Sequence, residues 1–305
     1  MIQFNNIHLL INPVSGKGSR ANKLKIIRER LKAAFPDIIE HTTSQKGDAE
    51  VYAGKIKYDD TSLLIICGGD GTINEVVNGL GPDSKAIFCV LPIGSGNDFC
   101  KTAGYDGDIS KLIDSIKKPK ILTADLGHIE YISNESNQSF SRYFASSSGI
   151  GFDALVALIS NRKSFLKGLP LYLSSVFIGL NKYSSLKTTI RTGDSVVEGR
   201  KFMLSFGNGR TSGGGFLLTP EASLNDGKLD MCTVDEITKL RVFSLLPKAI
   251  TGKHVTEKEV NYSQISKVSL KIDSGFIVHF DGEVETCEPG EVKIRCEKAA
   301  VKLLK

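Results

Sequence analysis

Short apolar runs alternate with amphipathic stretches over the first 125 or so residues. The apolar runs predict buried strands at 7–11, 38–42, 62–67 and 86–91, and the other stretches predict helices at 19–35, about 48–58, 72–80 and 108–117. Strands that are apolar throughout and alternate with helices are typical of a parallel sheet covered on both faces. This part of the chain is therefore predicted to be an α/β domain.

Past Leu126 the pattern changes to pairs of strands around polar turns. Hairpins are expected within 127–149 and 186–206, further strands at 229–235, 265–273 and 276–281, and helical insertions near 163–184 and 237–250. This pattern predicts a second, mainly antiparallel domain. We expect residues 1–125 to form the first domain, 126–290 the second, and 291–305 to rejoin the first.

Composition and charge narrow the class of protein. A chain of 305 residues has room for two domains, each with its own core. The net charge of +5 suits contact with phosphates or an acidic membrane surface, but no concentrated basic run indicates a nucleic-acid partner. The six scattered cysteines contain no C-x-x-C pair and are expected to be buried thiols in a reducing compartment. Without a signal segment or an apolar run of about 18 residues, the chain is expected to be cytoplasmic.

The stretch "CGGDGTINEVV" places a glycine cluster with one acid between a predicted strand and a predicted helix. Glycines allow tight turns and let a ligand approach the backbone, and a helix N-terminus favours anions. Asp70 would repel a phosphate unless a cation lies between them, and Mg²⁺ satisfies both partners. The alternative is a structural turn in which Asp70 caps the helix.

Two further loops have the same character. "PIGSGNDF" (92–99) carries Ser95 and Asp98 and follows the strand at 86–91, and "NPVSGKGS" (12–19) follows the first strand. Parallel α/β sheets bind ligands at the carboxyl ends of their strands, so the three loops are predicted to share one crevice.

Two other nucleotide-binding motifs fit this part of the chain less well. The Walker pattern is absent from the sequence. Residues 16–21 match the dinucleotide fingerprint G-x-G-x-x-[GA], with Glu40 about 20 residues further on, but Pro13 disrupts the tight turn that this fingerprint needs.

The motifs together resemble one family. "GGDGTINEVVNGL", "NPVSGKG" and "PIGSGNDF", followed in order by "GIGFDALV", "GNGRTSGGGFLLTPEASLNDGKLD" and "FDGE", are similar to the diacylglycerol kinase catalytic domain family. That family also contains sphingosine, ceramide and bacterial lipid kinases, and the resemblance covers nearly the whole chain. It implies a Rossmann-like parallel sheet of the NAD-kinase and diacylglycerol-kinase type, followed by a mainly antiparallel β-sandwich.

The resemblance implies an ATP site. The residues expected to hold the nucleotide are Asn12, Pro13, Val14, Ser15, Gly16, Thr43, Gly68, Gly69, Asp70, Gly71, Thr72, Ile73, Asn74, Ser95 and Asp98. Ser95 stands where threonine is usual and keeps the hydroxyl. Ser146 stands where asparagine is expected, and the aromatic residue often found between "NGR" and "GGG" is missing.

The resemblance also implies metal ligands. "SLNDGKLD" is similar to the family's structural magnesium loop, in which Asp226 would supply a carboxylate and Ser223 and Lys228 their backbone carbonyls. The alternative is a plain Asn-Asp-Gly turn. Asp98 and Asp125, expected at the ends of parallel strands, are further candidates for holding Mg²⁺.

Phosphoryl transfer requires positioning, charge neutralisation and an oriented nucleophile. The family pattern implies that Asp70 is a ligand of Mg²⁺ or of its water, and that Glu283 in "FDGE" accepts the proton of the attacking hydroxyl. The five histidines show no metal-ligand spacing and are expected to be structural or exposed.

The segment 162–185 bears on access to a lipid. It is rich in Leu, Phe and Tyr, and a helix from about Pro170 would place Leu173, Val176, Phe177 and Leu180 on one stripe. Its basic residues are Arg162, Lys163, Lys167 and Lys182. Such a segment either docks on a bilayer or caps the β domain.

The sequence thus predicts an ATP- and Mg²⁺-dependent lipid kinase that acts on a diacylglycerol-like lipid at the inner membrane surface. A homodimer is left open. The alternatives are a kinase of a soluble nucleotide such as NAD, and a non-catalytic nucleotide- or lipid-binding regulator.

Overall fold

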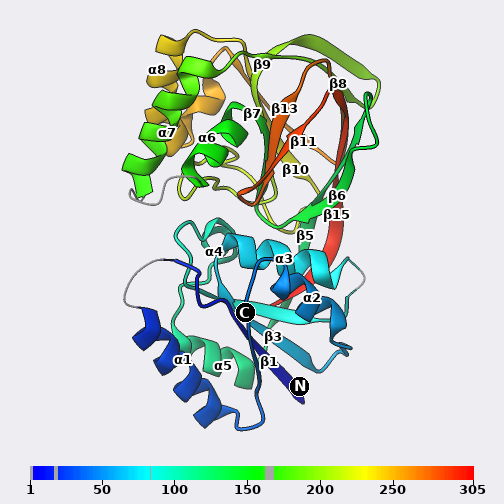
Figure 1. Cartoon of the computed structure of the whole chain (residues 1–305). Coiled ribbons are helices and arrows are strands. Elements are labelled where there is room, and N and C mark those ends of the chain that lie inside the picture. Colours follow the sequence, from blue (N-terminus) through cyan, green and yellow to red (C-terminus); the bar gives the residue numbers. More distant parts are fainter. Residues whose placement is uncertain (1–2, 17–19, 83, 162–167) are drawn as a thin grey trace.

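The computed structural model describes residues 3–16, 20–82, 84–161 and 168–305 (Figure 1). The middle of the dinucleotide fingerprint, 17–19, and three of the basic residues near the lipid segment, Arg162, Lys163 and Lys167, lie outside the described residues. Among the described residues, no helix has both the length and the apolar character needed to cross a bilayer. All six cysteines are free thiols, and five of them are buried.

The first half is a parallel α/β layer structure, as predicted. Its strands β1 (Asn6–Ile11), β2 (Ile39–Thr42), β3 (Ser62–Gly68) and β4 (Ile87–Pro92) lie in the order β4-β3-β1-β2. Helices α1 (Arg20–Ala34) and α5 (Ile109–Lys117) bury apolar side chains against one face. Helices α2 (Asp48–Lys55), α3 (Asp70–Leu80) and α4 (Asp98–Ala103) cover the other face. The carboxyl ends of β1, β3 and β4 therefore meet at one edge.

The second half is mainly antiparallel, also as predicted. Its strands are β6 (Ser139–Phe144), β7 (Ser147–Gly151), β8 (Leu186–Thr192), β9 (Ser195–Gly207), β10 (Leu229–Asp235), β11 (Val260–Ile265), β12 (Lys267–Ile272), β13 (Phe276–Phe280) and β14 (Glu283–Cys287). Helices α6 (Phe152–Asn161), α7 (Gly168–Lys182) and α8 (Lys239–Ile250) gather beside β7, and a short 3₁₀ turn, η1 (Lys253–Thr256), follows α8 (Figure 1).

Two long strands run through both halves. β5 (Ile121–Ser133) and β15 (Gly290–Leu304) pair antiparallel along almost their whole length. β15 pairs with β12 in the second half, and Lys302 and Leu303 then pair in parallel with β4. The ladder between β5 and β15 shifts between Glu297 and Val301, where Ala299 adopts a positive φ of 51°. A bulge of this kind bends the ribbon, so the same two strands serve two differently oriented layers.

The structure departs from the sequence analysis, or adds to it, in three places. Asp125 does not end a parallel strand, because it lies within β5, which is antiparallel to both of its neighbours. Helices α4 and α6 were not predicted, since short apolar runs do not distinguish strand from helix. The expected stripe on α7 is divided: Val176 and Leu180 are buried, whereas Leu173 and Phe177 are exposed.

The packing of α2 on α3 supplies a test of the fold. Gly79 of α3 faces α2 so closely that a Cβ would lie 2.2 Å from the backbone oxygen of Glu50. Gly→Ala in a helix normally stabilises by up to about 1 kcal/mol, but here the clash is with backbone. We expect Gly79→Ala to lower the free energy of unfolding by about 1–3 kcal/mol, measured by urea denaturation. Gly199→Ala, where no atom lies within 4 Å of the added Cβ, is the control and should change stability by less than about 1 kcal/mol. An unchanged or higher stability of Gly79→Ala would contradict this packing.

Candidate active site

The predicted glycine loops meet at the carboxyl edge of the parallel sheet. Asn12 Nδ2 donates a hydrogen bond to Thr72 Oγ1 over 2.9 Å, and the hydroxyl of Ser15 lies 3.3 Å from the same atom. A Cβ on Gly68 would lie 2.6 Å from the Thr72 side chain, so the strand can turn into α3 only with glycine there. The loop after β1 and the loop after β3 are therefore joined.

The loop after β4 approaches the same place. A Cβ on Gly94 would lie 2.5 Å from Gly69 Cα, which shows that the two loops touch backbone to backbone. A Cβ on Gly96 would lie 2.8 Å from Asp70 Oδ2. Glycine at these positions brings bare backbone next to the Asp70 carboxylate, as a phosphate site requires.

Asp70 begins α3 rather than capping it. The N-cap position belongs to Gly69, which has no side chain to cap with, so the alternative that Asp70 is a helix cap is wrong. Asp70 Oδ1 accepts a hydrogen bond of 3.3 Å from the backbone N–H of Phe99. Burial, and then the negative charges of Asp98 and Asp281, raise the pKa of Asp70 to about 7. The site therefore concentrates negative charge that a cation would neutralise.

Asp98 connects the two halves. It is buried at the start of α4, and its Oδ2 accepts a 2.8 Å hydrogen bond from the backbone N–H of Gly214 in the glycine loop after β9. Lys101, one turn later on α4, donates to the Gly214 carbonyl oxygen over 2.7 Å and lies 3.4 Å from Asp98. Ser95, in contrast, is exposed at the edge of the cavity described below.

Asp281 was not among the predicted site residues, although it stands in the "FDGE" motif. Its buried carboxylate accepts hydrogen bonds of 2.7, 2.8 and 3.0 Å from the backbone N–H groups of Ala145, Ser146 and Ser147. A fourth comes from Asn74 Nδ2 on α3, over 3.1 Å. Burial raises the pKa of Asp281, and these hydrogen bonds oppose that effect. Asp281 adopts a positive φ of 50°, which aspartate tolerates in a turn before glycine.

Glu283 approaches the first turn of α3 from the second half. It is the first residue of β14, and its Oε1 lies 3.2 Å from the position of a Cβ on Gly71. Its Oε2 forms an ion pair with Lys46, which lies between β2 and α2. The structure thus brings Glu283 to the glycine loop that also holds Asp70.

The other predicted nucleotide residues divide into two groups. Asn12, Ser15 and Gly16 border the glycine loops, with Pro13 and Val14 exposed beside them, and the N–H of buried Thr43 is bonded to Ile11 O at the end of β1. Ile73 and Asn74 face inward: Ile73 packs in the core and its N–H is bonded to Gly69 O, and Asn74 is committed to Asp281 and the Tyr143 carbonyl. Their side chains offer no contact to a nucleotide.

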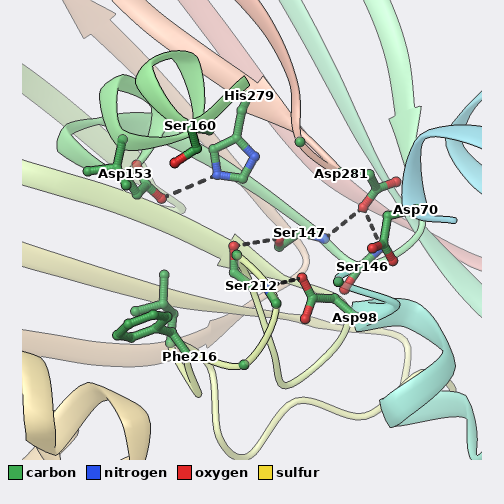
Figure 2. A pocket seen from close by; sticks show the side chains of 18 of the residues that line it. Asp70, Asp98, Ser146, Ser147, Asp153, Ser160, Ser212, Phe216, His279 and Asp281 are labelled. Atoms are coloured by element: carbon green, nitrogen blue, oxygen red, sulfur yellow. Dashed lines mark hydrogen bonds and ion pairs between the residues drawn. The ribbon is translucent and has the colours of Figure 1, made fainter. Parts of the chain in front are cut away.

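A cavity of about 470 Å³ opens between the halves. Asp70, Asp98 and Asp281 lie at one end of it, with Ser146, Ser147 and Ser212 between them (Figure 2). The Ser147 and Ser212 hydroxyls are 3.2 Å apart.

The other end of the cavity has a polar cluster that the sequence reasoning missed. Asp153, Ser160 and His279 line it, with His279 Nε2 lying 3.5 Å from Asp153 Oδ2 (Figure 2). In the described part of the chain, Asp153 Oδ2, Ser160 Oγ and His279 Nδ1 are buried without a hydrogen-bond partner. Unpartnered buried polar atoms are costly, so a ligand that pairs with them would bind here. His279, expected to be structural or exposed, is buried and paired with Asp153, and it also lines this cavity.

A second, apolar pocket of about 50 Å³ adjoins the cavity. Asp153, Phe216 and Leu218 line both spaces. The pocket's remaining lining includes aliphatic and aromatic side chains of β9, β10 and α8, among them Phe202, Met203, Val234, Val242 and Leu245.

The predicted magnesium loop forms a hydrogen-bonded turn. Asp226 Oδ1 accepts from the Lys228 N–H, and its Oδ2 accepts from Gln264 Nε2. Asp125 accepts from the N–H groups of Gly227 and Ala299. The Ser223 hydroxyl donates to Asn225. Each of these carboxylate oxygens accepts one hydrogen bond and keeps a second lone pair, so the magnesium site stays a prediction.

The acidic end of the cavity also fits a divalent cation. Among the described residues, no group of three His, Cys, Asp or Glu side chains is close enough to hold a metal by itself. Mg²⁺ ordinarily takes one or two carboxylates, with phosphate oxygens and water completing its coordination. Asp70, whose pKa is raised and whose Oδ1 accepts a 3.3 Å hydrogen bond from the Phe99 N–H, is the residue that would hold it.

Comparisons with known proteins agree with this architecture. Residues 6–129 match the family of diacylglycerol kinase catalytic domains, and residues 146–305 match the family of YegS C-terminal NAD kinase beta sandwich-like domains. A diacylglycerol kinase of Bacillus subtilis (strain 168) is 29% identical over 289 residues, which cover 93% of this chain and 91% of that protein. A diacylglycerol kinase of Mycobacterium tuberculosis (strain ATCC 25618 / H37Rv) is 25% identical over 292 residues, covering 95% and 92%.

Solved structures share the fold. A diacylglycerol kinase from Bacillus anthracis str. Sterne aligns with a TM-score of 0.71 at 22% identity, covering 99% of this chain and 97% of the other. A yeast NADH kinase in complex with NADH aligns with a TM-score of 0.52 at 12% identity, covering 98% and 82%. Both likenesses concern the fold alone.

The raised pKa of Asp70 predicts how stability depends on pH. Because the folded state holds this proton more tightly than the unfolded state, whose pKa is about 4, stability is lost as pH rises from about 4 through about 7. Asp70→Asn removes the buried charge. In metal-free buffer we expect this variant to be more stable than the wild type by about 1–2 kcal/mol at pH 8 and nearly equal at pH 4.5, measured by urea denaturation. Equal stability at both pH values would contradict the assigned charge repulsion.

Proposed function

The chain belongs to the diacylglycerol kinase family, and from that premise we propose that it transfers the γ-phosphoryl group of ATP to a hydroxyl of a diacylglycerol-like lipid. Relatives that are named diacylglycerol kinase match along nearly the whole chain. The enzyme class, a kinase, follows from the family; the nucleotide, the metal and the lipid are the content of the proposal.

One observation carries the choice of a lipid acceptor. The cavity has acids and glycine loops at one end, and at the other end it shares a wall with an apolar pocket. A soluble nucleotide acceptor would need polar groups along its whole length, whereas a lipid needs a polar end and an apolar end. The order of these features matches a lipid whose hydroxyl points toward the glycine loops.

At the acidic end, the chain's residues would position the nucleotide. The N–H groups of the three glycine loops and the N-terminus of α3 would face the phosphates. Asp70 would hold Mg²⁺, which when bound neutralises charge on the transferred group. Glu283 would take the proton of the lipid hydroxyl. The hydroxyl oxygen would then bond to the γ-phosphorus while the bond from that phosphorus to the leaving ADP breaks.

At the other end, the polar cluster would orient the acceptor. Asp153 stands where the cavity and the apolar pocket share their wall, so it would meet the polar backbone of the lipid. Ser160 and His279 would pair with further oxygens of that backbone, and the acyl chains would begin along Phe216 and Leu218, at the wall shared with the apolar pocket.

The exposed side chains of α7 and α8 support access from a membrane surface. Leu240 is 82% exposed and Phe177 is 61% exposed. The ring of Phe177 on α7 lies beside the ring of Phe243 on α8, with the ring centroids 6.4 Å apart. Exposed Lys182 and Lys239 flank this apolar area. An apolar surface flanked by lysines suits the interface of an anionic bilayer.

A transfer assay tests the proposed reaction. With γ-³²P-ATP and lipids in mixed micelles, we expect label in a diacylglycerol-class lipid that depends on Mg²⁺, with none in NAD. Glu283→Gln should lower kcat by about 10²–10⁴-fold, as expected for the loss of a general base, and Asp70→Asn should abolish the dependence on Mg²⁺ together with most of the activity. Label in NAD alone would instead support a kinase of a soluble nucleotide, and ATP binding without transfer would support a regulator.

The membrane surface has its own test. The triple variant Phe177→Ser, Leu240→Ser, Phe243→Ser should bind vesicles of anionic phospholipid about 10- to 100-fold more weakly in a sedimentation assay, since each side chain contributes up to about 1.5–3 kcal/mol on full burial. Val196→Ser, which removes an exposed apolar side chain from the hairpin between β8 and β9, is the control. Equal binding by all three proteins would exclude this surface.

A further inference from the structure

Lys46 lies in a loop that α3 holds in place. The loop joins β2 to α2, and the backbone N–H groups of Gly47 and Ala49 donate hydrogen bonds of 2.9 and 3.1 Å to the Glu75 carboxylate. Gly47 adopts a φ of 84°, which turns the chain into α2. The backbone of Lys46 is therefore fixed at the carboxyl edge of the sheet, beside the glycine loops.

The side chain of Lys46 reaches across the cleft to the second half of the protein. Its ammonium forms an ion pair with Glu283 Oε2, although 77% of the Lys46 side chain and 32% of the Glu283 side chain remain exposed. The charges that face this ammonium are acidic: Glu283 first, then Glu285 on β14 and Glu75 on α3, and the hydrogen bond with Glu283 raises the pKa of Lys46. Lys46 is thus a charged, solvent-accessible group at the predicted general base.

The same ammonium lies close to the place where phosphates would bind. Glu283 Oε1 is 3.2 Å from the Cβ position of Gly71, in the first turn of α3, and Oε2 of the same carboxylate holds Lys46. One carboxylate therefore separates the lysine from the glycine loop. A lysine on a long flexible stem can cross that distance by rotating its side chain.

Exposed ion pairs are weak, because water and salt screen them and ordering two long side chains costs entropy. A nucleoside triphosphate that enters beside such a pair offers the lysine more negative charge than one carboxylate does. The ammonium would therefore exchange partners when the nucleotide binds.

We propose that Lys46 is a nucleotide-sensing residue that holds Glu283 while the cleft is empty and moves to the γ-phosphate of the bound nucleotide. Glu283 is then free to accept the proton of the acceptor hydroxyl only when a phosphoryl donor is present. This inference rests on the proposed function, since it assumes that ATP binds at the glycine loops and that Glu283 is the general base.

The preference for ATP over ADP tests the exchange without relying on catalysis. Binding of MgATP and MgADP to the full-length protein would be measured by calorimetry for the wild type, Lys46→Met and Lys46→Arg. We expect Lys46→Met to weaken MgATP binding about 10-fold and MgADP binding less than 2-fold, because only ATP carries the γ-phosphate. Lys46→Arg, which keeps the charge, should stay within about 3-fold of the wild type for both. Lys111→Met is the matched control: Lys111 is 70% exposed and pairs with Asp106, outside the cleft.

Steady-state kinetics then distinguish a Lys46 that moves to the γ-phosphate from a Lys46 that stays paired with Glu283. If Lys46 leaves Glu283 when the nucleotide binds, Lys46→Met should raise KM for ATP about 10-fold and leave kcat within 2-fold of the wild type. A kcat that falls while the preference for ATP over ADP is unchanged would show that Lys46 stays on Glu283, and would overturn the proposal. If no variant or wild-type protein transfers phosphate to a lipid, the proposed function fails. The binding measurement still decides whether Lys46 contacts the γ-phosphate.

Discussion

The buried carboxylate of Asp281 holds the two halves of the protein together at the cavity. A buried charge is costly unless it is hydrogen-bonded, and a carboxylate can accept about four hydrogen bonds. Asp281 receives three from the 145–147 backbone and one from Asn74 on α3. Because α3 begins at Asp70 and β14 begins at Glu283, this one group sets the position of both predicted catalytic residues. The rest of the site depends on that link.

Three carboxylates, those of Asp70, Asp98 and Asp281, lie at this end of the cavity, and structural roles account for only two of them. Asp281 is satisfied by its four donors, and Asp98 is satisfied by Gly214 and Lys101, so each has a structural role between the halves. Burial, and then the repulsion of both other acids, raise the pKa of Asp70, and the hydrogen bond from the Phe99 N–H only partly opposes them. A protein keeps such an unfavourable group where a ligand compensates for it. The electrostatics thus indicate where the cation of the nucleotide would lie.

The sequence predicted the layers and the loops better than it predicted the second half of the site. An apolar strand that is followed by glycines and then by a helical pattern predicts a tight loop between strand and helix. The site residues of that loop, Gly68, Asp70 and Thr72, were therefore predicted from the sequence. Asp281, Asp153 and His279 gave no such signal, because their roles come from contacts between segments more than 100 residues apart. Helix α6 was missed because its short apolar run also fits a strand. The predicted stripe on α7 is partly buried and partly exposed, because neighbouring elements pack against only some of its residues. Such packing between elements cannot be predicted from the pattern of one segment.

The helices inserted into the antiparallel half show how one cavity would accommodate the two chemically different ligands of the proposed reaction. Asp153 lies in the first turn of α6, at the wall that the cavity shares with the apolar pocket, and α8 lines that pocket as well. The phosphate end is built instead from backbone, held by glycines and by Asp281. Side chains on α6 and α8 can therefore change in size without moving the glycine loops. In the proposed reaction, selection of the acyl chains and transfer of the phosphoryl group would be physically separate, and they would meet only at the polar cluster of Asp153 and His279.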